Sequence, residues 1–193
     1  MRALTGILAG VALVVVASAP LRESTQDRVV AFAHAVLTGR VEPADWDGRD
    51  IPYSWGGGHA KAPGPSTGTC RGYRGSIRPC PAERTRGLDC SGLTRWVYHL
   101  AHGRDVLGPG NTNDHLARLR RVPADEAVPG DLVFYGQVTP RRRTHHVGVY
   151  IGGGRMINAL KTGTVVRVDP ITAVKGLAGF YRYDRPARRP AAR

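Results

Sequence analysis

Two residues of this chain have the types and sequence settings needed for covalent catalysis. Cys90 stands within Asp89-Cys90-Ser91-Gly92-Leu93 at the start of a stretch with helical periodicity, and His146 opens an alternating stretch that predicts a strand. A cysteine at a helix N-terminus can be held as a thiolate by the positive end of the helix dipole, and a histidine can complete the ion pair. This pattern is typical of a cysteine nucleophile with its base.

The helix that carries Cys90 is predicted from apolar spacing. Between Leu93 and Ala101, apolar residues recur at i, i+3, i+4, i+7 and i+8. Asp89 is a suitable N-cap and Gly103 a suitable end. Cys90 would then lie in the first turn, where backbone N–H groups lack helical partners and could form an oxyanion hole. Because a lone cysteine on a helix face is usually a small buried hydrophobe, the catalytic interpretation depends on the other motifs.

The base is predicted from strand alternation. Residues 147, 149 and 151 are apolar and point to one side, so His146 points to the other. His145 is the rival base, but alternation places it on the apolar side. We therefore expect His146 to be the base.

A partner for His146 is predicted from a hairpin. A turn of three glycines would place Ile151 opposite Arg155, and counting back, Gly148 then faces Asn158. Asn158 would be a diagonal neighbour of His146 on the same face. Its amide could accept the imidazole N–H and fix the tautomer, as the third member of a triad. A register shift of one residue would break this inference.

Five motifs follow one another along the chain: Tyr53-Ser54-Trp55-Gly56-Gly57, Leu88-Asp89-Cys90-Ser91-Gly92-Leu93, Pro129-Gly130-Asp131-Leu132-Val133-Phe134, His146-Val147-Gly148-Val149-Tyr150-Ile151-Gly152 and Met156-Ile157-Asn158-Ala159. In this order they resemble the NlpC family of cell-wall cysteine peptidases, over about residues 45–184. The resemblance implies an α+β, papain-like fold with the nucleophile helix packed on a central antiparallel β-sheet. It also implies hydrolysis of peptidoglycan stem peptides, often at the γ-D-glutamyl to diamino acid bond.

The resemblance also implies roles for individual residues. Cys90 matches the nucleophile and His146 the base. Asn158 matches the third polar residue, where histidine is commoner in the family and asparagine or glutamine is also seen. The positions that line the substrate cleft in relatives are Tyr53, Asp89 and Ser91. No metal or organic cofactor is expected. The alternatives are a catalytically silent wall-binding module, and an amidase or acyltransferase on the same scaffold.

A long insert between Trp55 and Cys90, rich in glycine, proline and arginine, departs from the family pattern. Three cysteines in an exported chain leave one unpaired. Cys70 and Cys80, close together in this loop, are the expected disulfide, which would stabilise the fold by roughly 2–3 kcal/mol. Cys90 then stays free. Three reduced thiols are the alternative, and a zinc site is disfavoured by the cysteine spacing.

The ends of the chain predict processing and disorder. Residues 1–19, with Arg2 before a short apolar run, predict a signal peptide, with an uncleaved membrane anchor as the alternative. An N-terminal helix is expected within residues 20–44, and the catalytic domain with its insert within residues 45–184. The basic tail, residues 185–193, is expected to be disordered.

Other elements are predicted from local patterns. A helix is expected from Ser24 to Thr38, ended by Gly39, and a short helix from Asn113 to Arg120, capped by Thr112. The further strands expected are residues 132–135, 165–168 and 179–183.

The net charge of +13 would attract polyanions. No nucleic-acid motif accompanies this charge, so nucleic acid is not an expected partner. The cell wall, with its stem carboxylates and often anionic polymers, fits an exported chain better. A solvated basic surface is the alternative. We therefore expect a secreted, monomeric protein that acts on peptidoglycan stems in the cell wall.

Overall fold

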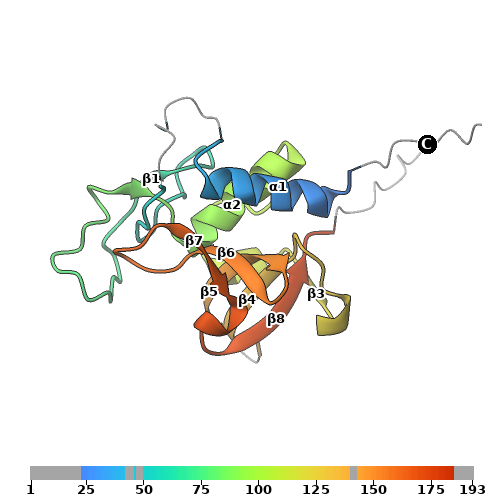
Figure 1. Ribbon diagram of the computed structural model, residues 1–193. Helices are drawn as coiled ribbons and strands as arrows, with labels where there is room; N and C mark the ends of the chain where they lie inside the picture. The colour runs from blue at the N-terminus through green and yellow to red at the C-terminus, as the bar shows by residue number, and fades with distance from the viewer. Residues whose placement is uncertain (1–22, 42–45, 47–49, 140–142, 185–193) are drawn as a thin grey trace, which may run out of the picture.

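The computed structural model describes residues 23–41, 46, 50–139 and 143–184. They form an α+β fold in which a six-stranded antiparallel sheet carries two long helices on one face (Figure 1). The fold class predicted from the sequence is therefore confirmed. The predicted signal peptide and the basic tail lie outside the described residues. Within the described part of the chain, no helix has the length and apolar character needed to cross a membrane.

Helix α1, Thr25–Leu37, matches the predicted N-terminal helix to within one residue at each end. Ser24 caps it, and Asp27 completes a capping box with Ser24. Its buried residues, Val29, Ala33 and Val36, follow the helical spacing of one face. The helix packs on the second long helix, α2, Cys90–His102.

Helix α2, Cys90–His102, begins and ends where the sequence predicted. The Asp89 side chain accepts the Gly92 N–H at 2.7 Å, and Gly103 ends the helix with a φ of +67°. Most of its apolar residues are buried, and the helix packs on strands β5, Arg143–Gly152, and β6, Arg155–Ala159, of the sheet. Cys90 is therefore the first helical residue, held at a fixed point beside the sheet.

The sheet has the strand order β3-β8-β4-β5-β6-β7. Its strands are β3 Arg120–Val122, β4 Leu132–Gln137, β5 Arg143–Gly152, β6 Arg155–Ala159, β7 Val166–Pro170 and β8 Leu177–Arg182. The main core lies between the helices and one sheet face, and includes Leu93, Val147 and Ile157. A smaller apolar cluster, with Tyr135 and Met156, covers the other face.

The hairpin between β5 and β6 differs from the prediction at its turn. Arg155 pairs with Gly152 rather than with Ile151, because the turn contains only Gly153 and Gly154, both with positive φ. Ile151 is the extra residue of a bulge next to this turn. The bulge restores the predicted register, so Tyr150 pairs with Met156.

The predicted short helix was wrong at both ends. Helix α3 is Thr112–Leu116, and its N-cap is Asn111 rather than Thr112, because Asn111 and Asp114 form a capping box. The chain then forms edge strand β3, which pairs with β8. Arg120, which the local pattern had assigned to the end of the helix, is therefore the first residue of this strand.

The insert between Trp55 and Cys90 extends to one side of the sheet, at the left of Figure 1. It contains the short antiparallel pair β1, Ser66–Thr67, and β2, Arg86–Gly87. Cys70 and Cys80 form a disulfide, as predicted, and Cys90 is the free cysteine of the chain.

Candidate active site

A cavity of about 450 Å³ lies at the N-terminal end of α2. One wall comes from the segments before α2, and the other from residues 110–113 and the start of β5. Its lining includes Tyr53, Trp55, His59, Asp89, Cys90 and Ser91. The predicted nucleophile and all three predicted cleft residues therefore meet in one place.

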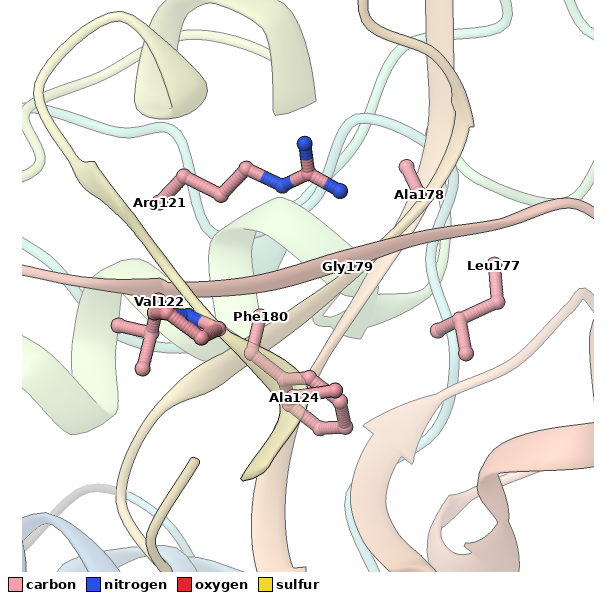
Figure 2. Close-up of a pocket in the computed structure, with 8 residues that line it drawn as sticks. Arg121, Val122, Ala124, Leu177, Ala178, Gly179 and Phe180 are labelled. Carbon is pink, nitrogen blue, oxygen red and sulfur yellow. The ribbon is translucent and has the colours of Figure 1, made fainter. Parts of the chain in front are cut away.

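A second hollow, about 540 Å³, lies at the β3 edge of the sheet (Figure 2). Apolar side chains, including Val122, Leu177 and Phe180, form most of its wall, and Arg121 is the one charged residue of its lining. It contains neither a nucleophile nor an acid–base pair. The chemistry of the lining therefore identifies the cavity at Cys90 as the candidate active site.

Glycines at the start of the insert let its backbone approach the first turn of α2. A Cβ on Gly92 would collide with the Gly57 carbonyl oxygen, and a Cβ on Gly58 would lie 2.6 Å from the Gly92 Cα. The same Gly57 carbonyl accepts the Asp89 N–H at 3.0 Å. The Gly-Gly and Asp-Cys-Ser-Gly motifs are therefore two halves of one backbone contact, which fixes the first turn of α2.

The Cys90 thiol lies against strand β5. It is 8% exposed, and the backbone N–H groups of Val147, Ser91 and Cys90 itself are directed at its sulfur. Burial raises the pKa of Cys90 to about 12, and the negative charge of Asp89 adds to the rise, which outweighs the three N–H groups. The thiolate predicted from the helix dipole is therefore not the favoured form in this structure.

His146 is buried next to the residue that contacts the Cys90 sulfur. Its Nε2 lies 2.9 Å from Asn158 Oδ1, so the register predicted from the hairpin brings the two together. Burial lowers the pKa of His146 to about 4 despite this hydrogen bond. Among the described residues no hydrogen bond joins Cys90 to His146. Such bonds are often long before substrate binds, and a neutral imidazole is the form that accepts a proton.

Asn158 has a second partner that the sequence analysis missed. Its Nδ2 donates to Asp169 Oδ2 at 2.9 Å, and Asp169 is itself paired with Arg167 at 2.8 Å. Asp169 lies on β7, two residues from the residue opposite Asn158. Strand alternation could have indicated it, but the predicted strand ended at residue 168.

His59 is another polar residue of the cavity that the sequence analysis missed. Its Nε2 lies 3.0 Å from Asp89 Oδ1 and 3.1 Å from Oδ2, while the Ser91 hydroxyl donates to Oδ1 at 2.8 Å. Buried Arg95 holds the loop of His59 by donating to the carbonyls of Gly58 and Ala60. His59 lies at the start of the insert, outside the quoted motifs, so no local signal indicated it.

Tyr53 lines the cavity close to the nucleophile. Burial raises the pKa of the Tyr53 hydroxyl, and the negative charges of ionised Cys90 and Asp89 raise it further. The hydroxyl therefore stays protonated and can donate a hydrogen bond into the cavity.

His145, the rival base, also lines the cavity. It is exposed, whereas His146 is buried and has the amide partner. The geometry thus favours His146 as the oriented imidazole. In the described part of the chain, no group of three or more His, Cys, Asp or Glu side chains is arranged to hold a metal ion.

Comparison with known proteins gives a family match. The NlpC/P60 family matches residues 49–176. Among curated relatives, peptidoglycan endopeptidase RipB of Mycobacterium tuberculosis is 38% identical over 121 residues, which are 63% of this chain and 42% of RipB. A γ-D-glutamyl-L-lysine dipeptidyl-peptidase of Bacillus subtilis is 34% identical over 86 residues, which are 45% of this chain and 28% of that protein. The matched segment thus spans less than half of each of these relatives.

Solved structures agree with this match. The P60 domain of a Mycobacterium avium subspecies paratuberculosis antigen superposes with a TM-score of 0.58 at 29% identity, covering 81% of this chain and 92% of that domain. RipD of Mycobacterium tuberculosis, described as a non-catalytic NlpC/p60 domain protein adapted to peptidoglycan binding, gives a TM-score of 0.56 at 27% identity, covering 82% of this chain and 95% of RipD.

Proposed function

The chain belongs to the NlpC/P60 family, and from this premise we propose that it is a cysteine peptidase that hydrolyses peptidoglycan stem peptides. The observation that carries the proposal is that Cys90 lines the cavity while its sulfur faces the backbone N–H of Val147. Val147 directly follows His146 on β5, and His146 is hydrogen-bonded to Asn158. A nucleophile, a base and an orienting amide are the groups that acyl transfer requires.

In the proposed mechanism, proton transfer accompanies attack. His146 takes the Cys90 proton as the sulfur attacks the scissile carbonyl, because the neutral pair is favoured before substrate binds. The backbone N–H of Cys90 and the hydroxyl of Tyr53 stabilise the oxyanion. His146 then protonates the leaving amine and afterwards activates the water that releases the acyl group. Asn158 keeps the ring aligned throughout.

The bond proposed is the one between D-glutamate and the diamino acid of the stem. Relatives named as peptidoglycan endopeptidases and as a γ-D-glutamyl-L-lysine dipeptidyl-peptidase support this choice. Tyr53, Asp89 and Ser91 would hold the stem, since all three line the cavity. An amidase or acyltransferase on the same scaffold would give products of different mass.

The proposed location is outside the cytoplasm, in the cell wall, with the protein secreted as a monomer after removal of residues 1–19. The relatives that act on peptidoglycan support this location. The insert offers a surface for anionic wall polymers, because three of its arginines are exposed around the disulfide: Arg71, Arg74 and Arg78. Nucleic acid is not a proposed partner.

A wall-binding module without turnover is the second candidate, because RipD has this fold and is described as non-catalytic. Cys90 and the hydrogen bond between His146 and Asn158 argue against this second candidate, because binding alone requires neither of them. Incubation with purified sacculi separates the two candidates. A peptidase releases soluble fragments, whereas its Cys90→Ala variant sediments with the sacculi and releases none. If the wild type also sediments without releasing fragments, the binding module is the better account.

A further inference from the structure

Three buried polar side chains form a row across β5, β6 and β7. His146 Nε2 lies 2.9 Å from Asn158 Oδ1, and Asn158 Nδ2 donates to Asp169 Oδ2 at 2.9 Å. These residues are 5%, 0% and 5% exposed, respectively. Arg167, opposite Asn158 in the register, forms an ion pair with the other oxygen of Asp169 at 2.8 Å.

The order of donors and acceptors in this row follows from Asp169. An ionised carboxylate only accepts hydrogen bonds, so the NH₂ group of Asn158 must face Asp169. The Asn158 oxygen then faces His146 and also only accepts, so His146 Nε2 must carry the ring proton. A neutral imidazole has one N–H, which leaves Nδ1 unprotonated as the nitrogen that can accept a proton.

We propose that Asp169 is a positioning residue of this site, which sets the amide orientation of Asn158 and through it the tautomer of His146. The inference rests on the proposed function, in which His146 is the base for Cys90. If the carboxylate is absent, the Asn158 amide can turn over and present its NH₂ group to Nε2. His146 would then carry its proton on Nδ1 and could no longer accept the thiol proton there.

The described surroundings of Asn158 offer no other hydrogen-bond acceptor for its amide. Among the described residues, the side chain of Asn158 has hydrogen bonds only to His146 and Asp169. Gly148 lies beside Asn158, since a Cβ on Gly148 would be 3.2 Å from the Asn158 Cβ, and glycine has no side chain that could accept a hydrogen bond. The orientation of the amide therefore depends on one acceptor.

The decisive readout is the tautomer itself, measured by ¹⁵N NMR of histidine-labelled protein at neutral pH. We expect His146 to be protonated on Nε2 in the wild type. In Asp169→Leu, which removes the acceptor, and in Asp169→Asn, whose amide can face Asn158 either way, we expect partial or full transfer of the proton to Nδ1. An unchanged Nε2 tautomer in both variants would overturn the inference.

Kinetics on stem peptides give the second readout. We expect Asp169→Asn to lower kcat at least 10-fold while KM changes less than threefold, since substituting the orienting group of a triad affects chemistry more than binding. In an Asn158→Ala background, the same substitution should lower kcat no further. An equally large loss in that background would contradict the inference, because Asp169 would then act by another route.

A control separates positioning from stability. Asp131→Asn removes another buried carboxylate, paired with Arg182 at 2.6 Å at the start of β4. We expect it to lower the melting temperature without changing the His146 tautomer. The NMR result tests the inference separately from the proposed function. If the His146 tautomer changes in the Asp169 variants but the protein cleaves no stem peptide, the positioning role of Asp169 is supported and the peptidase function is rejected.

Discussion

His59 Nε2 contacts both carboxylate oxygens of Asp89, at 3.0 and 3.1 Å, on the cavity wall beside the nucleophile. The same carboxylate caps α2 by accepting the Gly92 N–H, so Asp89 has a structural role as well as its contact in the cavity. Its charge also raises the pKa of Cys90. Asp89 thus couples the start of the nucleophile helix to the polar wall of the cleft.

Asp89→Asn should separate these roles. Asparagine is as good an N-cap as aspartate, so we expect the melting temperature to change little. Loss of the negative charge should lower the pKa of Cys90, so the thiol should react several-fold faster with iodoacetamide at pH 8 in the absence of substrate. The measurement is the pseudo-first-order alkylation rate from pH 6 to 10. Asp125→Asn, at an exposed position outside the cavity, is the matched control. A slower reaction of Asp89→Asn would contradict the electrostatic role given to Asp89.

Buried His115 makes stability depend on pH. Its Nε2 lies 3.0 Å from the Gly108 carbonyl, and its Nδ1 has no hydrogen-bond partner among the residues that the structure describes. Burial lowers the pKa of His115 to about 4. Below the ordinary histidine pKa of about 6.5, the unfolded chain binds a proton that the folded chain excludes, so stability falls as the pH falls from 6.5 towards 4. Between pH 7 and 5 the loss is about 2 kcal/mol for this residue.

We expect His115→Gln to remove this part of the acid sensitivity, as measured by urea unfolding at pH 7 and pH 5. His34→Gln, which makes the same substitution at an exposed position on α1, is the matched control. Equal pH dependence in His115→Gln and the wild type would contradict this account, because the pKa of His115 would then not differ between the folded and unfolded states.

The disulfide of the insert supports one wall of the cleft. Trp55 donates to the Arg71 carbonyl at 3.0 Å, and its ring lies edge-on to Tyr73, both within the loop closed by Cys70 and Cys80. We expect Cys70→Ser/Cys80→Ser to lose on the order of 2–3 kcal/mol of stability. We also expect KM for stem peptides to rise while kcat is nearly unchanged, because Cys90 is not involved. Alkylation of the wild type without reductant should label Cys90 alone; labelling of two or three cysteines would exclude the disulfide.

Gly148 leaves room for the pair formed by His146 and Asn158. A Cβ at this position would lie 2.8 Å from the Met156 sulfur and 3.2 Å from the Asn158 Cβ. We expect Gly148→Ala to cost about 1–3 kcal/mol of stability, as overpacking does. It should also lower kcat by displacing Asn158. Unfolding curves and stem-peptide kinetics check both effects, and a variant with wild-type kcat would show that the amide is not displaced.

Much of the site could be predicted because its determinants are local. The cap and the end of α2 are encoded by Asp89 and Gly103. The approach of Asn158 to His146 followed from alternation and a short turn, even though the bulge at Ile151 was not foreseen. The predicted turn was one residue too long, but the extra residue of the bulge, Ile151, compensates for this error. The pairing from Tyr150 back along β5 therefore has the predicted register.

The remainder depends on contacts that no local pattern contains. The pKa directions of Cys90 and His146 follow from burial, which the helix-dipole argument did not include. His59 contacts Asp89 from a loop whose carbonyls accept hydrogen bonds from Arg95, far along the chain. Strand β3 pairs with β8, more than fifty residues later in the chain, and no local pattern predicted it. Such features arise from tertiary packing.

The most direct test of the central claim is mass spectrometry of purified peptidoglycan stem fragments after incubation with the protein from residue 20 onward, beside Cys90→Ala. The account predicts two kinds of new fragment, one that ends at D-glutamate and one that begins at the diamino acid. Cys90→Ala should form neither. Stem fragments left intact by the wild type, or cleaved equally by Cys90→Ala, would contradict it.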